Sequence, residues 1–348
     1  MTSNEYSSLK IITNDQDLNV TKWQHFVEKN PNGNYFYLPS FYYLCKSSSF
    51  FSPHLIALVN DDYEIMGLLI YFVQSRKFIT NKISFNRIII WGEPFFSPGI
   101  DTSNLHEILL SIFIKEFKKK SWVYCEIRNF TPPSPDFISV CKKYQFHYKY
   151  HYNIHLEISE HFIWSDSFSK SKVRQIKQSL KNGAKIVIAE TLEEFHEFYK
   201  ILKLLYRTKI KKPLPDWNFF MAVFQTYLEQ NNIKIILIKF NNKVIGGSIC
   251  PVFSNRVLYN WYIAGLDKHY SGIFPSVLAT FGLIDHACRN NYKMVDFMGA
   301  GTPKKPYGVR DFKLRFGGKL IQTGRYIKVN NRFLYFILRL ALKFKIHV

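Results

Sequence analysis

The stretch IKIILIKFNNKVIGGSICPVF, residues 233–253, consists of two β-rich runs joined by an Asn-Asn turn. Apolar and β-branched residues dominate both runs, and this pattern around a turn dipeptide predicts a hairpin. A second stretch, HLIALVNDDYEIMGLLIYFV at residues 54–73, has the same organisation around Asn-Asp-Asp. Each hairpin has a glycine directly after one apolar pair, Gly67 in the first and Gly246 in the second. The chain therefore carries two copies of one hairpin.

The segments after each hairpin also correspond. NRIIIWG from Asn86 matches NRVLYNW from Asn255, a helical stretch follows in each half, and the runs WVYCEI and KMVDF then form short strands. Helical segments precede the hairpins, at residues 20–30 in the first half and at 192–210 and 217–230 in the second. A strand, helix, strand crossover implies a parallel pair within a mixed sheet. The order predicts two tandem α/β domains with mixed sheets, produced by duplication.

Composition limits the classes of partner and the compartment. Lys plus Arg number 47 against 26 Asp plus Glu, and the formal charge of +21 favours an anionic partner such as nucleic acid, nucleotide or anionic lipid. The five cysteines form no CxxC pair, which argues against a disulfide framework and a zinc knuckle. The sequence shows neither a signal peptide nor an apolar run long enough to span a bilayer. We expect a cytoplasmic protein, at most attached to a membrane face.

Two further segments carry chemistry-bearing residues. SFSKSKVRQIKQSLKNGAKI, residues 167–186, begins with serines that can cap a helix and ends at Asn182-Gly183, which predicts a basic, solvent-facing helix. His147, His151 and His155 are spaced by four, but FHYKYHYNIHLEI alternates like a strand, and a strand spreads them too far apart for one ion. No metal site is expected there.

The closing part of the sequence resembles a known family. VDFMGAG from Val295, followed by YGVRDFKLRFGGKLIQTGRY from Tyr307, is similar to the signature of the FemABX peptidyltransferases, in which an Asp-Phe strand end and a glycine precede Gly-x-x-x-Phe-Lys-x-x-Phe-Gly-Gly. NGNYFYLPSFYYLCK at 32–46 resembles the start of the family's first domain, and the basic helix resembles the start of its second. The resemblance extends over nearly the whole chain.

The resemblance implies a fold and an activity. The fold is a pair of GNAT-like (acyl-CoA N-acyltransferase) domains, expected at residues 1–157 and 158–330, before a basic amphipathic C-terminal helix at 331–348. That helix is compatible with a membrane interface or with closing a domain core. The implied activity is transfer of an aminoacyl group from aminoacyl-tRNA to the side-chain amine of a peptidoglycan precursor, lipid-linked or nucleotide-linked, with no cofactor besides the acyl donor.

Two alternatives remain open. Related proteins are thought to use acyl-CoA on envelope or exopolysaccharide sugars, and the third reading is a non-catalytic RNA-binding protein. GNAT enzymes cradle the CoA pyrophosphate with a glycine-rich loop at a helix N-terminus. Here the loop LDKHYSGIFPSV has only Gly272, and Pro275 near the helix start supplies no N–H, which favours the aminoacyl-tRNA donor.

The resemblance also implies site residues. Lys313 is expected at the donor's carbonyl and phosphate end, with a surface lysine on a strand as the alternative. Tyr262 is expected to donate a hydrogen bond in the site, or to be a core aromatic. Asp296 is the candidate general base because it ends a strand beside glycine-rich turns, where function often lies in α/β sheets, or it is the cap of a turn. Proton transfer to the substrate or to water, without a protein base, is the other alternative. The remaining candidates are Phe312, Arg310, Arg315 and Gly317 on the donor side and Lys46, Arg207 and Glu93 on the acceptor side.

Overall fold

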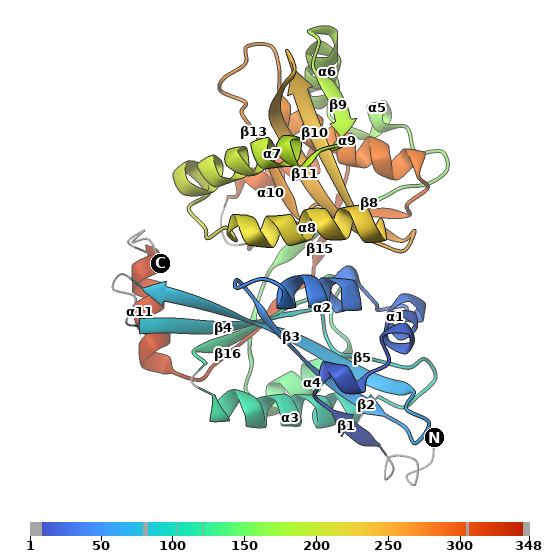
Figure 1. Ribbon diagram of the computed structural model, residues 1–348, viewed down its shortest axis with the longest axis vertical. Helices are drawn as coiled ribbons and strands as arrows, with labels where there is room; N and C mark the ends of the chain where they lie inside the picture. The colour runs from blue at the N-terminus through green and yellow to red at the C-terminus, as the bar shows by residue number, and fades with distance from the viewer. Residues whose placement is uncertain (1–8, 79–82, 103, 121, 304–305, 344–348) are drawn as a thin grey trace. The chain divides into compact units, whose positions relative to one another are not determined.

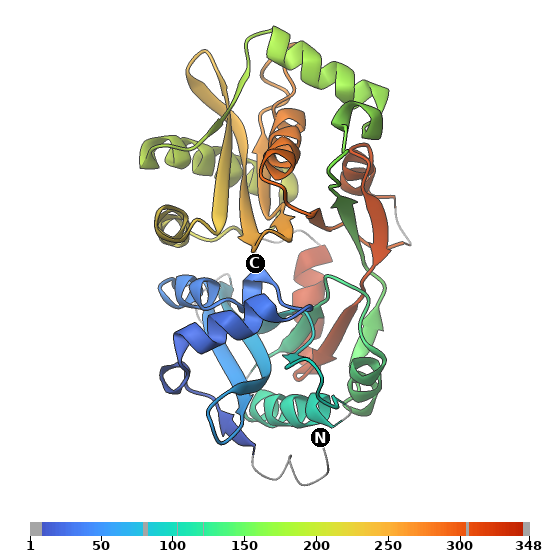
Figure 2. The same ribbon diagram turned by 90° about the vertical axis from the view of Figure 1, so that its right-hand side faces the viewer.

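The structure, a computed structural model, describes residues 9–78, 83–102, 104–120, 122–303 and 306–343 of the 348-residue chain. The chain divides into two compact units, one formed by Met1–Tyr150 with Thr323–Val348 and the other by His151–Gln322. Figures 1 and 2 show both units, with the chain coloured from blue at the N-terminus to red at the C-terminus. Each unit contains one eight-stranded mixed sheet with helices packed on it, so the α/β fold class is confirmed.

The first unit has the sheet order β1-β2-β3-β4-β6-β16-β7, with β5 pairing β3 off this path. Strands β4 and β6 are parallel and α3 connects them, while the other pairs are antiparallel. Its elements are β1 (Lys10–Ile12), η2 (Asp15–Asp17), α1 (Val20–Lys29), η3 (Tyr35–Tyr37), α2 (Pro39–Lys46), β2 (Ser52–Val59), β3 (Ile65–Phe78), β4 (Ile83–Trp91), β5 (Phe95–Phe96), α3 (Leu105–Lys119), β6 (Tyr124–Arg128), α4 (Pro135–Lys143), β7 (His147–Lys149), β16 (Arg325–Val329) and α11 (Arg332–Lys343).

The second unit has the order β15-β8-β14-β12-β11-β10-β9, with β13 pairing β11. Its parallel pair is β12 and β14, joined through β13 and α9. Its elements are β8 (Tyr152–Glu157), α5 (Trp164–Ser167), α6 (Lys170–Lys181), β9 (Lys185–Ile188), α7 (Leu192–Leu205), η4 (Tyr206–Ile210), α8 (Trp217–Gln230), β10 (Ile233–Phe240), β11 (Lys243–Phe253), β12 (Val257–Tyr259), β13 (Tyr262–Gly265), α9 (Pro275–Arg289), β14 (Met294–Gly299), α10 (Gly308–Leu314) and β15 (Lys319–Gln322).

Both units show the predicted order of hairpin, strand, helix and strand. In the first unit this is β2-β3, β4, α3 and β6, and in the second it is β10-β11, β12 with β13, α9 and β14. A Cβ on Gly265 would lie 2.3 Å from the Ser276 amide nitrogen, so glycine lets the start of α9 lie directly against β13. The crossover helix of the second unit is thereby fixed at the sheet position where the candidate site lies.

Local signals place the helix ends. Ser169 is the N-cap residue of α6, Asn182 is its C-cap residue, and Gly183 follows with φ of 93°, a conformation that glycine adopts without a steric cost. Helix α8 occupies the predicted 217–230, and Asp216 accepts the Phe219 amide proton at 3.1 Å as its N-cap. The segment predicted at 20–30 is α1. The segment predicted at 192–210 is α7 followed by a π-helical turn, η4.

The observed units depart from the predicted ranges 1–157, 158–330 and 331–348. Strand β8 belongs to the second sheet because it pairs with β14 and β15. The chain then returns to the first sheet at β16, which pairs with β6 and β7, and α11 packs Leu338 against Val123 and Tyr124 of the first unit. The prediction of one unbroken segment per domain was therefore wrong, because the partner of a strand is chosen by a distant part of the chain.

Helix α11 has two apolar faces, one buried and one exposed. Leu338 is buried, whereas Phe333 and Phe336 are 71% and 59% exposed and Leu340 is also exposed, on a face that Arg332 and Arg339 flank. One face thus closes the core of the first unit while a second apolar face meets solvent. No helix within the described ranges combines the length and apolarity needed to cross a bilayer.

Candidate active site

Two neighbouring strands of the second sheet separate part of the way along their length. β12 and β14 are paired from Val257 and Met294 to Tyr259 and Asp296, and the Asn260 amide still donates to the Asp296 carbonyl at 2.9 Å. Beyond this point the chain continues as β13 along β11, whereas β14 continues along β8. We call the place where β13 and β14 separate the strand fork.

Backbone N–H groups of β13 face the strand fork. The Leu266 amide donates to the Ile245 carbonyl of β11 at 3.0 Å, so this register position directs its N–H toward β11. Alternate residues of an antiparallel ladder face alternate sides. The N–H groups of Ile263 and Gly265 therefore point to the opposite edge, which β14 has left. Donors in this arrangement are suited to hold a carbonyl oxygen on which negative charge develops.

Buried polar side chains lie at the base of the strand fork. Asp296 is 1% exposed, its Oδ1 accepts the Met298 amide proton at 2.6 Å, and its Oδ2 lies 3.4 Å from Nε2 of His155, its cross-strand neighbour on β8. Oδ2 of Asp296 and Oδ1 of Asn260 are buried without a hydrogen bond to any described residue. The turn-capping role left open for Asp296 is present, and its role as a base stays a prediction.

Lys313 lies on the helix α10 and is buried, so the alternative of a surface lysine on a strand was wrong. Its Nζ donates to the carbonyl oxygens of Phe297, at 2.6 Å, and Gly299, at 2.9 Å, which belong to β14 just beyond the strand fork. Burial lowers the pKa of Lys313 from 10.5 to about 8, opposed by Asp296 and reinforced by Lys212. The ammonium therefore ties α10 to the end of β14.

The four predicted donor-side residues all lie on or directly after α10. Lys172 of α6 places its Nζ 4.5 Å from the centre of the Phe312 ring. Arg310 donates to the Thr302 carbonyl at 2.9 Å. Arg315 is exposed, and its carbonyl oxygen accepts the Ser169 amide proton at 2.9 Å, so it joins α10 to the start of α6. Whether these side chains meet a donor stays a prediction.

The paired glycines after α10 are explained by packing within the unit. Gly317 has φ of 87°, and a Cβ there would lie 2.8 Å from the Ser167 carbonyl oxygen. A Cβ on Gly318 would lie 2.4 Å from a methyl carbon of Ile154 on β8. The close backbone approach that these glycines permit is therefore made by residues of α5 and β8 within the same unit, and the donor-side role of Gly317 stays a prediction.

The N-terminus of α9 is occupied by the protein's own acceptors. Asp267 Oδ1 accepts the Ser276 amide proton at 2.8 Å, and Ser179 Oγ of α6 accepts that of Phe274 at 3.0 Å. The intervening residue is Pro275, which has no N–H. The amides of Phe274 and Ser276 are thus not available to a phosphate, and the Asp267 carboxylate stands at this helix end.

Tyr262 begins β13 at the strand fork and is half-buried among aromatic rings. Its ring centre lies 4.8 Å from that of Trp261, 5.3 Å from that of Phe220 and 6.2 Å from that of Tyr206. This confirms neither role proposed for Tyr262, since a hydroxyl at the rim of an aromatic cluster can also reach a ligand. Arg207 lies next to Tyr206 on η4 and is exposed.

The other two acceptor-side candidates lie in the first unit. Lys46 of α2 donates to both carboxylate oxygens of Asp15, at 2.9 and 2.8 Å, and so pairs with a carboxylate of its own unit. Glu93 accepts from the amide and the hydroxyl of Ser134, both at 3.1 Å. Burial raises the pKa of Glu93, and the Ser134 hydrogen bonds oppose this. Both residues have structural partners, and their acceptor roles stay predictions.

Sequence reasoning missed three residues of the second unit. His155 was considered only as a metal ligand, yet it is the cross-strand neighbour of Asp296. Asn260 and Asp267 were not singled out, although one lies at the strand fork and the other caps α9. An Asp eight residues before a helix start gives no recognisable local signal. In the part of the chain that the structure describes, no group of three His, Cys, Asp or Glu residues is arranged to bind a metal ion.

Sequence comparison finds a match within the second unit. Residues 169–313 match the family model described as an acetyltransferase (GNAT) domain. A search of curated proteins finds no relative by sequence.

Comparison of structures extends the similarity to the whole chain. FemX superimposes with a TM-score of 0.66 at 13% identity, over 94% of this chain and 99% of that chain. A tandem GNAT protein from the clavulanic acid biosynthesis pathway gives 0.61 at 9% identity, over 93% and 99%. L-PGS from Bacillus licheniformis gives 0.56 at 11% identity, over 93% and 96%. The predicted tandem GNAT fold is confirmed.

Proposed function

We propose that the chain is an acyltransferase that transfers an aminoacyl group from aminoacyl-tRNA to the amine of a peptidoglycan precursor. The acetyltransferase family match of residues 169–313 and the FemX-like tandem GNAT fold support this proposal. The site consists of the strand fork and of α10, whose Lys313 contacts the end of β14. The donor is an activated ester, and the acceptor is a neutral amine. No covalent intermediate on the protein is required.

The single observation that carries this choice of donor is the occupied N-terminus of α9. A CoA pyrophosphate needs free amides there, but Ser276 and Phe274 donate theirs to Asp267 and Ser179. Bringing a pyrophosphate to this position would break both hydrogen bonds and place its charge beside a carboxylate. A tRNA ester needs no such cradle, because its phosphates lie along an extended backbone.

The chemistry follows from the backbone of the strand fork. The ester carbonyl oxygen accepts from the N–H group of Ile263, which stabilises the negative charge as the amine nitrogen attacks the carbonyl carbon. The new C–N bond forms and the ester C–O bond breaks. The proton lost by the amine passes to the departing ribose hydroxyl, directly or through water. An ammonium has three N–H donors, so Lys313 keeps one for the donor while two hold β14.

A lipid-linked precursor would require the protein to meet a membrane. The exposed face of α11, with Phe333, Phe336 and Leu340 beside Arg332 and Arg339, has the composition of an interfacial helix. We include in the proposal a peripheral contact of this face with the inner surface of the membrane. The cytoplasmic location is part of the same proposal.

The test compares donors and acceptors directly. The purified protein is incubated with a mixture of aminoacyl-tRNAs or with acetyl-CoA, each with a nucleotide-linked and with a lipid-linked precursor, and the products are identified by mass spectrometry. Aminoacylated precursor formed only from tRNA is the expected result. Acetylated product from acetyl-CoA would establish the alternative function that the acetyltransferase family match favours, and RNA binding without turnover would reject both.

A pair of proline variants tests the strand fork itself. Ile263→Pro removes an N–H that faces the fork, whereas Ala264→Pro removes one that pairs with Gly247 in the sheet. Loss of one oxyanion donor should lower kcat by roughly 100-fold to 1000-fold in Ile263→Pro. Ala264→Pro should instead lower the free energy of unfolding more than Ile263→Pro does. Wild-type kcat in a folded Ile263→Pro protein would remove the backbone of β13 from the mechanism.

A further inference from the structure

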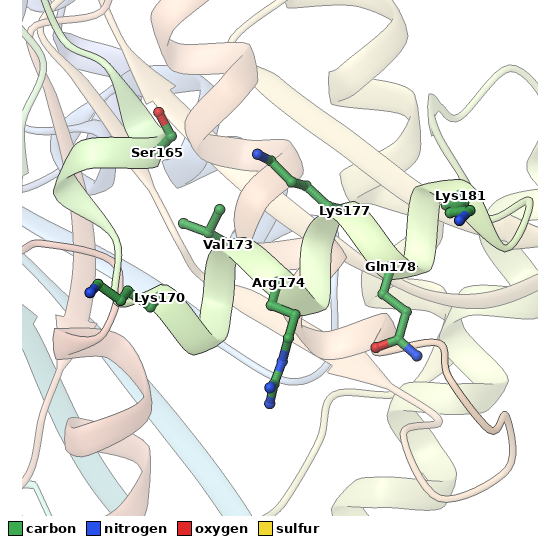
Figure 3. Close-up of a pocket in the computed structure, with 7 residues that line it drawn as sticks. All are labelled: Ser165, Lys170, Val173, Arg174, Lys177, Gln178 and Lys181. Atoms are coloured by element: carbon green, nitrogen blue, oxygen red, sulfur yellow. The ribbon is translucent and has the colours of Figure 1, made fainter.

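A shallow groove of about 570 Å³ runs along α6. Figure 3 shows its seven lining residues, which are Ser165, Lys170, Val173, Arg174, Lys177, Gln178 and Lys181. Four of them are cations, and all four cations are exposed. The groove is thus a basic surface with a small apolar floor at Val173.

Helical periodicity gathers these cations on one face. Lys170, Arg174, Lys177 and Lys181 are separated by four, three and four residues, so they recur once per turn on the same side of α6. With a rise of 1.5 Å per residue, the row is about 16 Å long. We call these four residues the α6 cation row.

No acidic residue of α6 neutralises this row, and none of its members forms an ion pair with another described residue. The acid nearest in sequence, Asp166, accepts from the Ser165 hydroxyl at 3.1 Å. Four like charges on adjacent turns repel one another and destabilise an isolated helix. A bound polyanion would relieve this repulsion and so stabilise the helix.

The opposite face of α6 is fixed to the elements that form the site. Lys172 is buried and lies over the Phe312 ring of α10, and burial lowers its pKa, with Arg315 adding to the effect. Ile176 is fully buried in the core, and Ser179 accepts the Phe274 amide proton ahead of α9. A ligand bound to the α6 cation row is therefore held on a rigid helix that contacts both α10 and the start of α9.

We propose that the α6 cation row binds the phosphodiester backbone of an RNA, and that it positions the tRNA of the donor beside the strand fork. The inference rests on the proposed function and adds the surface that the donor uses. Each cation neutralises a backbone phosphate and releases condensed counterions, so affinity should depend steeply on salt.

The shape and chemistry of the row favour RNA over other anions. A mononucleotide or pyrophosphate is compact and needs donors that converge, whereas these cations are strung along three turns. An anionic membrane surface is contacted by helices that also expose several large apolar residues. Within α6 only Leu180, at 42%, is a large exposed hydrophobic residue, while the described side chains of α11 include the exposed Phe333, Phe336 and Leu340. A polymer with regularly spaced phosphates matches the row.

The experiment measures binding of a deacylated RNA hairpin that copies a tRNA acceptor stem. Dissociation constants are determined at several salt concentrations for the wild type and for Lys177→Gln/Lys181→Gln. The logarithmic salt slope should fall by about 2, since each lost phosphate contact removes about one unit. The matched control is Lys118→Gln/Lys119→Gln, which removes the same charge from two exposed lysines of α3 in the first unit and should leave the slope unchanged.

Three results would overturn the inference. The salt slope of the α6 variant could equal that of the wild type, the α3 control could change as much, or vesicles of anionic phospholipid could displace the RNA through the same lysines. Failure of the proposed function has a different signature, since the variant would still lose RNA binding while no aminoacyl transfer occurs in any protein. Transfer from aminoacyl-tRNA that is unaffected at limiting donor in the α6 variant would reject the inference alone.

Discussion

Replacing Lys313 by Met should change how the stability of the second unit depends on pH. The Lys313 ammonium is buried against the Phe297 and Gly299 carbonyls, and burial lowers its pKa to about 8, whereas the unfolded chain should show the ordinary value near 10.5. Between these two pH values the unfolded chain binds more protons than the folded protein. The free energy of unfolding of the wild type therefore rises as pH increases through this window, and Met contributes nothing to that rise.

The magnitude follows from the same pKa difference. The full cost of burying the charge is present below pH 8 and amounts to about 3 kcal/mol. Raising the pH from 7 to 9.5 relieves about 2 kcal/mol of it. Met also leaves two carbonyls without their lysine donor, which costs about 1 to 3 kcal/mol each, but this loss does not vary with pH. The contribution of the buried charge is therefore obtained from the pH dependence of the difference in free energy of unfolding between the two proteins.

The assay is urea denaturation of wild type and Lys313→Met at several pH values from 7 to 9.5, with the transition of the second unit fitted separately. The wild type should gain about 2 kcal/mol relative to the variant over this range. Lys319→Met is the control, because the Lys319 side chain is 72% exposed and should give a constant difference. A constant difference for Lys313→Met would show that burial does not depress the pKa of Lys313, and the structural argument for its role would fail.

Two further predictions concern α11 and the glycines. The double change Phe333→Ser/Phe336→Ser should weaken cosedimentation of the protein with anionic phospholipid vesicles. Because both rings are exposed, it should shift the free energy of unfolding by less than about 0.5 kcal/mol. Undiminished vesicle binding would exclude this face from membrane contact. Gly318→Ala should lower the melting temperature of the protein, because the added Cβ would lie 2.4 Å from Ile154. Gly308→Ala should raise the melting temperature slightly, because no described atom lies within 4 Å of the added Cβ. Equal effects would show that the second unit relaxes around Gly318.

Local patterns in the sequence were sufficient for the repeat and for most helices. The two hairpins, the crossover order and helix α8 lie where periodicity and turn residues indicated them. Each of these signals acts between residues that are close in the chain, so it can be recognised without knowing the fold. The resemblance of the closing segment also pointed to the correct fold.

Only the tertiary structure decided which surfaces the site residues face. The burial of Lys313, the pairing of Asp296 with His155 and the capping of α9 by Asp267 each join residues from different elements. The return of β16 to the first sheet is of the same kind. Sequence determines these contacts only through the whole fold, because a strand edge or a buried carbonyl accepts any suitable partner that packing brings to it, however distant that partner is along the chain.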